Sequence, residues 1–193
     1  MNPIKRKILS AVFFSLFLFT FIGFMYCSGS NKAKDKWFYL NESASLDLGI
    51  YMKVPDVILC LQGRDFREYR KGDYVVFEPN NEALRIAKKR KYIEGTSLFL
   101  KKIGGLYGDT YAVQAINKKH YLFFINHELK GEVLKTDKNG KPMPIKEGRF
   151  EVPQDYFLPI GDSERSFDGR YTGVVKLSNI KSIVTPLYTG LHW

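Results

Sequence analysis

Hydrophobic residues follow two patterns along the chain. Residues 8–26 form an uncharged apolar run, close to the ~20 residues that a helix needs to cross a bilayer. From residue 51 onward the apolar runs are short and are separated by turn-forming residues, which is typical of β-strands. The pattern predicts one N-terminal transmembrane helix within a segment 1–30, followed by a mainly β domain over residues 31–193.

The short apolar runs predict the strands of this domain. They lie at residues 54–61, 73–77, 98–103, 110–116, 121–125, 174–177 and 180–184. One short helix is predicted at about 82–91, because Asn80 and Asn81 can cap its start and apolar residues share one side. Asn139-Gly140 indicates a hairpin-like loop at 135–140. We therefore expect an antiparallel β-sheet domain with one short helix.

The charges around the apolar run bear on its orientation. Lys5, Arg6 and Lys7 precede it, and three further lysines with one aspartate follow it. The positive-inside rule then leans toward a cytoplasmic N-terminus, which leaves the β domain outside the membrane. The alternative is a cleaved signal peptide, whose hydrophobic region is usually shorter. The sequence Cys-Ser-Gly-Ser after Tyr26 leaves cleavage open.

Overall composition limits the kinds of molecule that the chain is expected to bind. The 193-residue chain has a net charge of +10, but its basic residues are scattered. Such scatter indicates a solvated surface, or one facing anionic lipid, and no nucleic-acid partner is expected. Cys27 and Cys60 are far apart in sequence, which argues against a disulfide framework. The three histidines lack metal-binding spacing, so we expect no metal and no cofactor.

Two hydroxyls lie just beyond the apolar run, in residues 41–51. On a strand, Ser43 and Ser45 face the same side, and Gly49 permits a turn away from that side. A serine nucleophile needs an adjacent base. If no base lies nearby, the two serines are ordinary polar residues of a strand or turn. Asn41-Glu42-Ser43 also matches the sequon for N-glycosylation.

A candidate base lies in the apolar run 98–103. It contains Lys101 and Lys102, which face opposite ways on a strand. A lysine drawn into apolar surroundings has a lowered pKa and can act as a base. The spacing does not choose between the two lysines, and both could be surface residues of an edge strand.

A polar stretch at 162–173 is the third candidate. Ser166, Asp168 and Arg170 alternate there, so on extended chain they lie on one face. They could form a buried ionic network. The alternative is a solvent loop with an exposed ion pair, which contributes little to stability.

In order and spacing, these three stretches resemble the boxes of the type I signal peptidase family, and most of all the conjugative-transfer peptidases called TraF. The residues that carry the resemblance lie at 41–51, at 72–109 and at 166–173. The resemblance implies a Ser/Lys serine endopeptidase with Ser45 as nucleophile and Lys101 as base. It further implies that Ser43 and the main-chain N–H of Ser45 form the oxyanion hole. Ser166 would orient the lysine amine, with Asp168 and Arg170 as supporting residues.

The chain departs from the family pattern at four positions. They are Asp47 for proline, Tyr107 for proline, Gly169 for serine and Lys102 for arginine. None of them removes a proposed catalytic group, so the enzyme interpretation stands. Asp47, an anion near the cleft, is expected to alter which substrate residues are accepted.

The resemblance also implies a setting. We expect a single-pass protein of the bacterial inner membrane with a periplasmic catalytic domain. Its substrate would be a pilin or secreted precursor, with cyclisation of the pilin as one outcome, and its partners would be components of a type IV secretion or conjugation apparatus. Two alternatives stay open: a general signal peptidase for exported proteins, and a non-catalytic scaffold of such an apparatus.

Overall fold

The structure is a computed structural model that describes residues 38–41, 49–54, 65, 68–93, 97–117 and 120–189. All of them belong to one unit, Phe38–Trp193. The predicted anchor at 1–30 lies outside the described residues. Among the described residues, no helix has the length and apolar character needed to span a membrane.

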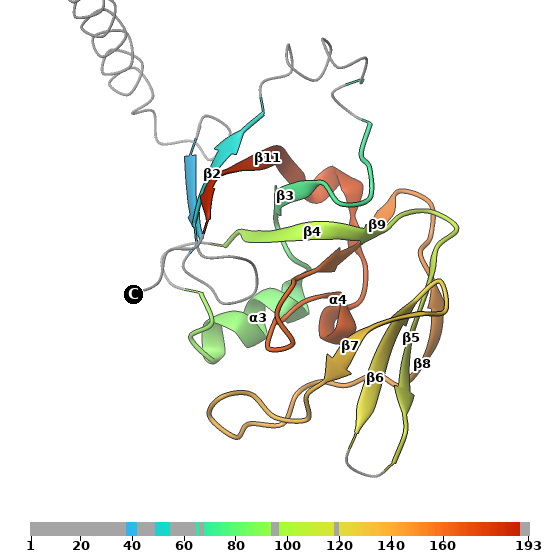
Figure 1. The fold of residues 1–193 in the computed structure, drawn as a ribbon. Helices are drawn as coiled ribbons and strands as arrows, with labels where there is room; N and C mark the ends of the chain where they lie inside the picture. The colour runs from blue at the N-terminus through green and yellow to red at the C-terminus, as the bar shows by residue number, and fades with distance from the viewer. Residues whose placement is uncertain are drawn as a thin grey trace, which may run out of the picture. The chain divides into compact units, whose positions relative to one another are not determined.

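The larger of two sheets has seven strands, and each of its pairings is antiparallel. Its order is β1-β2-β11-β3-β4-β9-β10 (Figure 1). The strands are β1 (Phe38–Asn41), β2 (Gly49–Lys53), β3 (Tyr74–Phe77), β4 (Phe99–Gly105), β9 (Tyr156–Ile160), β10 (Val175–Lys176) and β11 (Ile180–Thr189).

The smaller sheet is formed by four strands that are also antiparallel, in the order β7-β6-β5-β8. They are β5 (Thr110–Ala115), β6 (Tyr121–Ile125), β7 (Glu128–Val133) and β8 (Gly148–Glu151). The helical elements are α3 (Asn81–Lys89), α4 (Gly169–Thr172) and a 3-10 turn, η2 (Leu177–Asn179). The prediction of a mainly antiparallel β domain is confirmed.

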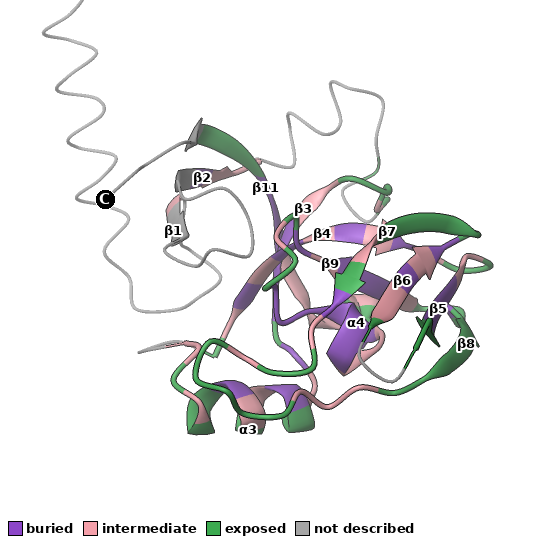
Figure 2. Ribbon diagram, turned by 60° about the horizontal axis from the view of Figure 1, so that its bottom comes forward, coloured by how far each residue is buried: buried purple, intermediate pink, exposed green. Residues whose placement is uncertain are grey.

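One hydrophobic core joins the two sheets. Val75 and Phe77 of β3 pack in the same cluster as Val113 of β5, Phe123 of β6 and Phe157 of β9. Along β4 every second residue is buried, beginning with Phe99, because side chains of a strand alternate between its faces. Buried residues are concentrated on β4, β9 and α4 (Figure 2). The strand β4 therefore directs one of its two lysines into this core.

The helix α3 begins where the sequence predicts it. The side chain of Asn80 accepts a hydrogen bond from the N–H of Ala83 at 2.8 Å, which satisfies one of the free donors of the first turn. The prediction of a single helix was wrong, since α4 and η2 are also present. The predicted strand 54–61 falls mainly outside the described residues, and β7, β8 and β9 were not predicted.

Candidate active site

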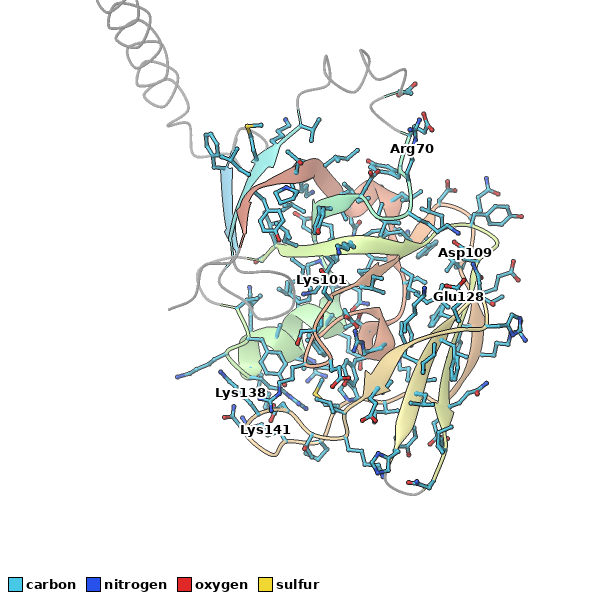
Figure 3. All side chains as sticks on the ribbon, viewed as in Figure 1. Arg70, Lys101, Asp109, Glu128, Lys138 and Lys141 are labelled. Atoms are coloured by element: carbon cyan, nitrogen blue, oxygen red, sulfur yellow. The ribbon has the colours of Figure 1, made fainter. Side chains whose placement is uncertain are left out.

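The two adjacent lysines of β4 have opposite surroundings. Lys101 is 5% exposed and lies on the core side of the strand, where it pairs with Val75 of β3 (Figure 3). Lys102 lies on the other side, where its Nζ donates to Asp162 Oδ1 at 2.8 Å. Its Nζ also lies 5.0 Å from the centre of the Tyr74 ring. Burial therefore distinguishes two lysines that spacing alone could not.

The surroundings of each lysine change its pKa. Burial lowers the pKa of Lys101 to about 8, against opposing attraction from Asp168 and together with repulsion from Arg170. For Lys102, partial burial acts to lower the pKa, but hydrogen bonds to Asp162 and Tyr74 raise it overall. Lys101 is thus the lysine that a proton leaves more easily near neutral pH.

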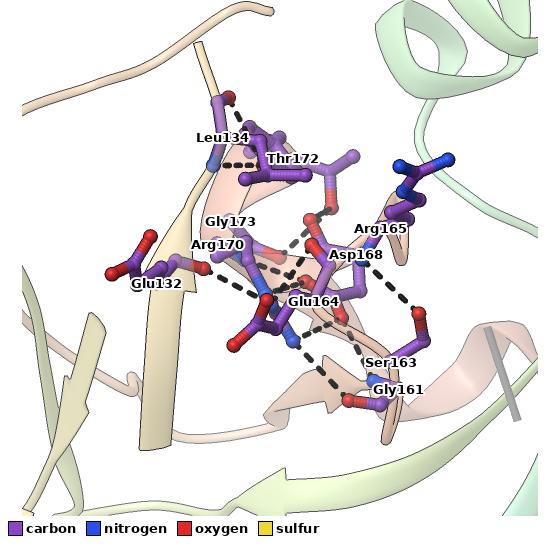
Figure 4. A network of polar contacts seen from close by, with 11 residues as sticks. Glu132, Leu134, Gly161, Ser163, Glu164, Arg165, Asp168, Arg170, Thr172 and Gly173 are labelled. Atoms are coloured by element: carbon purple, nitrogen blue, oxygen red, sulfur yellow. Dashed lines mark hydrogen bonds and ion pairs between the residues drawn. The ribbon is translucent and has the colours of Figure 1, made fainter. Parts of the chain in front are cut away.

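A buried ion pair lies in the loop that follows β9. Asp168 is 1% exposed and Arg170 is 5% exposed. Asp168 Oδ1 accepts from Arg170 Nε at 3.0 Å, and its Oδ2 accepts from the backbone N–H of Gly161 at 2.8 Å. The remaining guanidinium donors reach carbonyl oxygens of Glu132, Gly161 and Glu164 (Figure 4). A buried pair is tolerated when its other donors and acceptors are satisfied in this way.

The backbone geometry of this pair differs from the predicted one. The alternation argument assumed extended chain, but residues 169–172 form the short helix α4. Asp168 is its N-cap and also accepts from the backbone N–H of Arg170 at 3.1 Å. The predicted ionic network is present, but it forms because a capping aspartate meets a side chain two residues later.

Replacing Arg170 by methionine should lower the free energy of unfolding by about 3–5 kcal/mol, because the buried carboxylate of Asp168 loses its partner. Urea unfolding of the purified chain measures this. The exposed Arg165, in the same loop, supplies the control, and Arg165→Met should cost less than about 0.5 kcal/mol. The double variant Asp168→Asn/Arg170→Met should recover part of the loss. Equal costs for the two arginine variants would contradict the role of the buried pair.

Ser166 lies in the same loop and is fully buried. Its backbone N–H donates to the carbonyl of Ser163 at 3.0 Å, whereas its Oγ has no hydrogen-bond partner in the described part of the chain. Buried hydroxyls without a partner are rare and call for an explanation. The described residues therefore include a buried lysine, a buried ion pair whose charges act on that lysine, and a buried hydroxyl that has no partner among them.

The two serines proposed for catalysis, Ser43 and Ser45, lie outside the described residues, as does Asp47. In the sequence they fall between β1 and β2, whose ends pair as Asn41 with Gly49. Gly49 is itself the first residue of β2 and also pairs with Thr189 of β11. The predicted roles of the two serines are not tested by the described geometry.

The structure describes the surroundings of two residues that depart from the family pattern, Gly169 and Tyr107. At Gly169, a Cβ atom would lie 2.6 Å from both Leu158 Cδ1 and the carbonyl oxygen of Pro159. Only glycine fits there, because α4 packs directly on the backbone of β9. Tyr107 is 70% exposed and precedes Gly108, which has φ +84°. Gly169 lies between the two residues of the buried ion pair, Asp168 and Arg170, whereas Tyr107 lies in the turn between β4 and β5.

Sequence reasoning missed one charged residue, Asp162, which pairs with Lys102. The only feature of the sequence that could have pointed to Asp162 was its position in the polar stretch 162–173. No group of three histidine, cysteine, aspartate or glutamate side chains within the described ranges could hold a metal ion. His127 instead lies with Nε2 2.9 Å from a guanidinium nitrogen of Arg149.

Comparison with known protein families identifies the class of protein to which the chain belongs. The family model described as signal peptidase, peptidase S26, matches residues 4–188. The chain therefore belongs to the S26 signal peptidases, a family of serine peptidases.

Within that family the chain is similar to two plasmid transfer proteins TraF from Escherichia coli. One is 26% identical over 159 residues, covering 78% of this chain and 82% of the relative. The other is 31% identical over 130 residues, covering 62% and 70% respectively. The resemblance found in the sequence motifs is confirmed. A signal peptidase I from Enterococcus faecalis superposes with a TM-score of 0.35 at 18% identity, over 61% of this chain and 97% of that one, which is too low to add to the assignment.

Proposed function

We propose that the chain is a membrane-anchored serine endopeptidase that cleaves a pilin or secreted precursor during conjugative transfer, with Ser45 and Lys101 as its catalytic dyad. The observation that supports this best is Lys101. Lys101 is 5% exposed and its pKa is about 8, whereas an ordinary lysine titrates near 10.4. A family of serine peptidases needs a base beside its serine, and in this fold a buried lysine is well suited to that role.

The proposed reaction begins with neutral Lys101. Its Nζ takes the proton of Ser45 Oγ, and the oxygen attacks the carbonyl carbon of the scissile peptide bond. The oxyanion that forms is held by the main-chain N–H of Ser45 and the hydroxyl of Ser43. The C–N bond then breaks, the leaving amine takes the proton from Lys101, and an acyl-enzyme ester remains on Ser45.

The supporting residues act on the lysine. The buried hydroxyl of Ser166, which has no hydrogen-bond partner among the described residues, would orient the amine, as the family resemblance implies. Asp168 and Arg170 are joined by two side-chain hydrogen bonds, and each makes one hydrogen bond to the backbone of Gly161. Asp168 raises the pKa of Lys101 and Arg170 lowers it. The two residues of the pair therefore partly cancel each other's effect on the pKa of the lysine.

The names of the relatives and the sequence support a proposed cellular setting for the chain. The relatives are named plasmid transfer proteins, which favours conjugation over general export. The apolar run 8–26 would anchor the chain in the inner membrane, with the catalytic domain in the periplasm. Components of a type IV secretion or conjugation apparatus are its proposed partners.

Processing of a pilin precursor across a pH series tests the proposal. Lys101 must be neutral to act as base, so the rate should be low below its pKa and should rise about tenfold per pH unit up to about pH 8 before levelling. Membranes lacking the chain provide the control. No shortened product at any pH would support the scaffold alternative, and a rate independent of pH from 6 to 9 would contradict Lys101 as base.

The mass of the product reports how the acyl-enzyme is resolved. Attack by water gives a linear fragment, whereas attack by the amine at the start of the same pilin gives a circular product lighter by one water. Processing of many unrelated exported precursors in the same assay would favour the general signal peptidase alternative.

A further inference from the structure

The loop between β7 and β8 is fastened to the C-terminal end of α3 by polar contacts. Arg90 Nη2 donates to the carbonyl of Pro142 at 2.7 Å, and Arg90 Nη1 lies 3.3 Å from Asp137 Oδ2. The same carboxylate oxygen accepts from the hydroxyl of Tyr92 at 2.6 Å. The other oxygen, Oδ1, accepts from the backbone N–H of Lys141 at 2.9 Å. These contacts hold the loop beside α3, and two views of the chain show the two side by side (Figure 1, Figure 2).

Exposed lysines flank these contacts on both elements. Three of them lie at the end of α3 or just beyond it, next to Arg90, and two lie in the loop close to Asp137. Figure 3 shows the two loop lysines beside α3. Among the described residues none of these lysines has an ion-pair partner. We call this set the lysine surface: Lys88, Lys89, Lys91, Lys138 and Lys141.

Carboxylates within the two segments do not neutralise the lysine surface. The acidic residues of 81–93 and 135–146 are Glu82 and Asp137. The side chain of Asp137 is 5% exposed and is already paired inside the protein. Glu82 lies 4.0 Å from the amine of Lys146, which is outside the set. The positive charge of the lysine surface is therefore presented to solvent.

Helix electrostatics account for only part of this charge. Cations at the C-terminal end of a helix are favoured by its dipole, which explains Lys88 and Lys89 without any partner. It does not explain Lys138 and Lys141, which come from a different element and reach the same place through the contacts of Asp137. A surface that gathers like charges from two elements calls for an anionic partner.

The chemistry of the lysine surface favours lipid over protein as that partner. Its cations are all lysines, and none of the large apolar residues that are exposed in the described chain belongs to α3 or to this loop. Protein interfaces are enriched in aromatic residues, methionine and arginine and are depleted in lysine. Clusters of about four to eight basic residues, in contrast, attract acidic lipid headgroups through charge alone.

We propose that the lysine surface binds the headgroups of an anionic lipid bilayer. This contact goes beyond the proposed peptidase reaction, although it rests on the proposed membrane setting, in which the apolar run 8–26 holds the domain close to a bilayer. The attraction needs no shaped pocket, because each lysine near a negatively charged membrane contributes separately. Anchor and lysine surface together would limit how the catalytic domain can turn relative to the membrane.

Site-specific labelling of amines tests the contact in the full chain. The chain is reconstituted into bilayer nanodiscs of phosphatidylcholine, either alone or with about 30% phosphatidylglycerol to give a negative surface. Acetylation of each lysine is then followed by mass spectrometry. Lys138 and Lys141 should react about fivefold more slowly in the anionic bilayer. Lys130 of β7, which pairs with Glu128, should react equally in both, and high salt should remove the difference at the lysine surface.

A charge reversal shows whether the lysines cause the protection. Lys138→Glu/Lys141→Glu keeps the backbone N–H of Lys141 that binds Asp137, so the loop should stay beside α3. In this variant Lys88 should react at the same rate in both bilayers. Lys138→Arg/Lys141→Arg keeps the charge and should keep the protection of Lys88, and the control Lys130→Glu should keep it too. Slow acetylation of the buried Lys101 in every sample checks that the fold is intact.

The labelling needs no substrate, so it separates this inference from the proposed function. Protection by anionic lipid in Ser45→Ala supports the inference whether or not the chain proves to be a peptidase. Equal rates in the two bilayers, which a surface for an acidic protein partner would give, overturn it. Protection of Lys88 that persists in Lys138→Glu/Lys141→Glu also overturns it, and neither result bears on the dyad of Ser45 and Lys101.

Discussion

Replacing Ser45 with alanine should reduce cleavage of the pilin precursor by roughly 10⁴-fold or more. The change removes the oxygen that would form the acyl-enzyme, and no neighbouring group of the proposed dyad can replace it. The rate of product formation, followed by mass spectrometry, measures the loss. The change removes a single oxygen atom, so the thermal midpoint should stay within a few degrees.

Ser43→Ala supplies the control for the same stretch. It would remove one donor of the proposed oxyanion hole and leave the main-chain N–H of Ser45, so the expected loss is about 10²–10³-fold. A larger loss for Ser43→Ala than for Ser45→Ala would mean that the nucleophile is Ser43 and that the motif has been aligned incorrectly.

Replacing Lys101 with methionine should lower kcat by about 10³-fold, because the proposed general base is lost. Methionine keeps the length and apolar stem of lysine, so the side chain should still fill its place between Phe99 and Ile103 on β4. The same change at Lys102 removes the ion pair with Asp162 and the contact with the Tyr74 ring, and at pH values above the pKa of Lys101 it should cost less than about tenfold. The opposite ranking would show that the outer lysine is the base.

Stability distinguishes a lost base from a damaged fold in this experiment. The pKa of Lys101 is lowered on folding, so at pH 7 the folded chain bears the cost of holding an ammonium group in the core. Lys101→Met removes that cost, and its thermal midpoint should be equal to or above that of the wild type. A variant that lost both activity and stability would not support a catalytic role.

Elements with strong hydrophobic alternation were predictable from the sequence, whereas exposed and proline-containing strands were not. All four residues of β8 are exposed, so no alternation marks that strand. Pro159 lies inside β9, where the sequence argues against a strand. It is nevertheless paired, with Ile103 of β4. Both β8 and β9 are defined by their pairing with neighbouring strands, which only the three-dimensional structure shows.

The candidate site shows the same limit. The run 98–103 indicated that the two lysines face opposite ways, but it did not show that either is buried, because burial depends on which face of β4 meets the core. Local spacing at 166–170 found the correct ion pair with the wrong backbone, because the N-cap that folds Arg170 back onto Asp168 depends on the turn at Gly169. The pair of Lys102 with Asp162 joins residues 60 apart in sequence, and no local pattern marks such a contact.

The most direct test of the central claim is to trap the acyl-enzyme with a peptide ester substrate, quench in acid and map the modified peptide by mass spectrometry. The account predicts one adduct on Ser45 in the wild type, and no adduct in Ser45→Ala. It also predicts an adduct that forms about 10³-fold more slowly in Lys101→Met. An adduct on another residue, or an adduct formed at the wild-type rate in Lys101→Met, would contradict a dyad of Ser45 and Lys101.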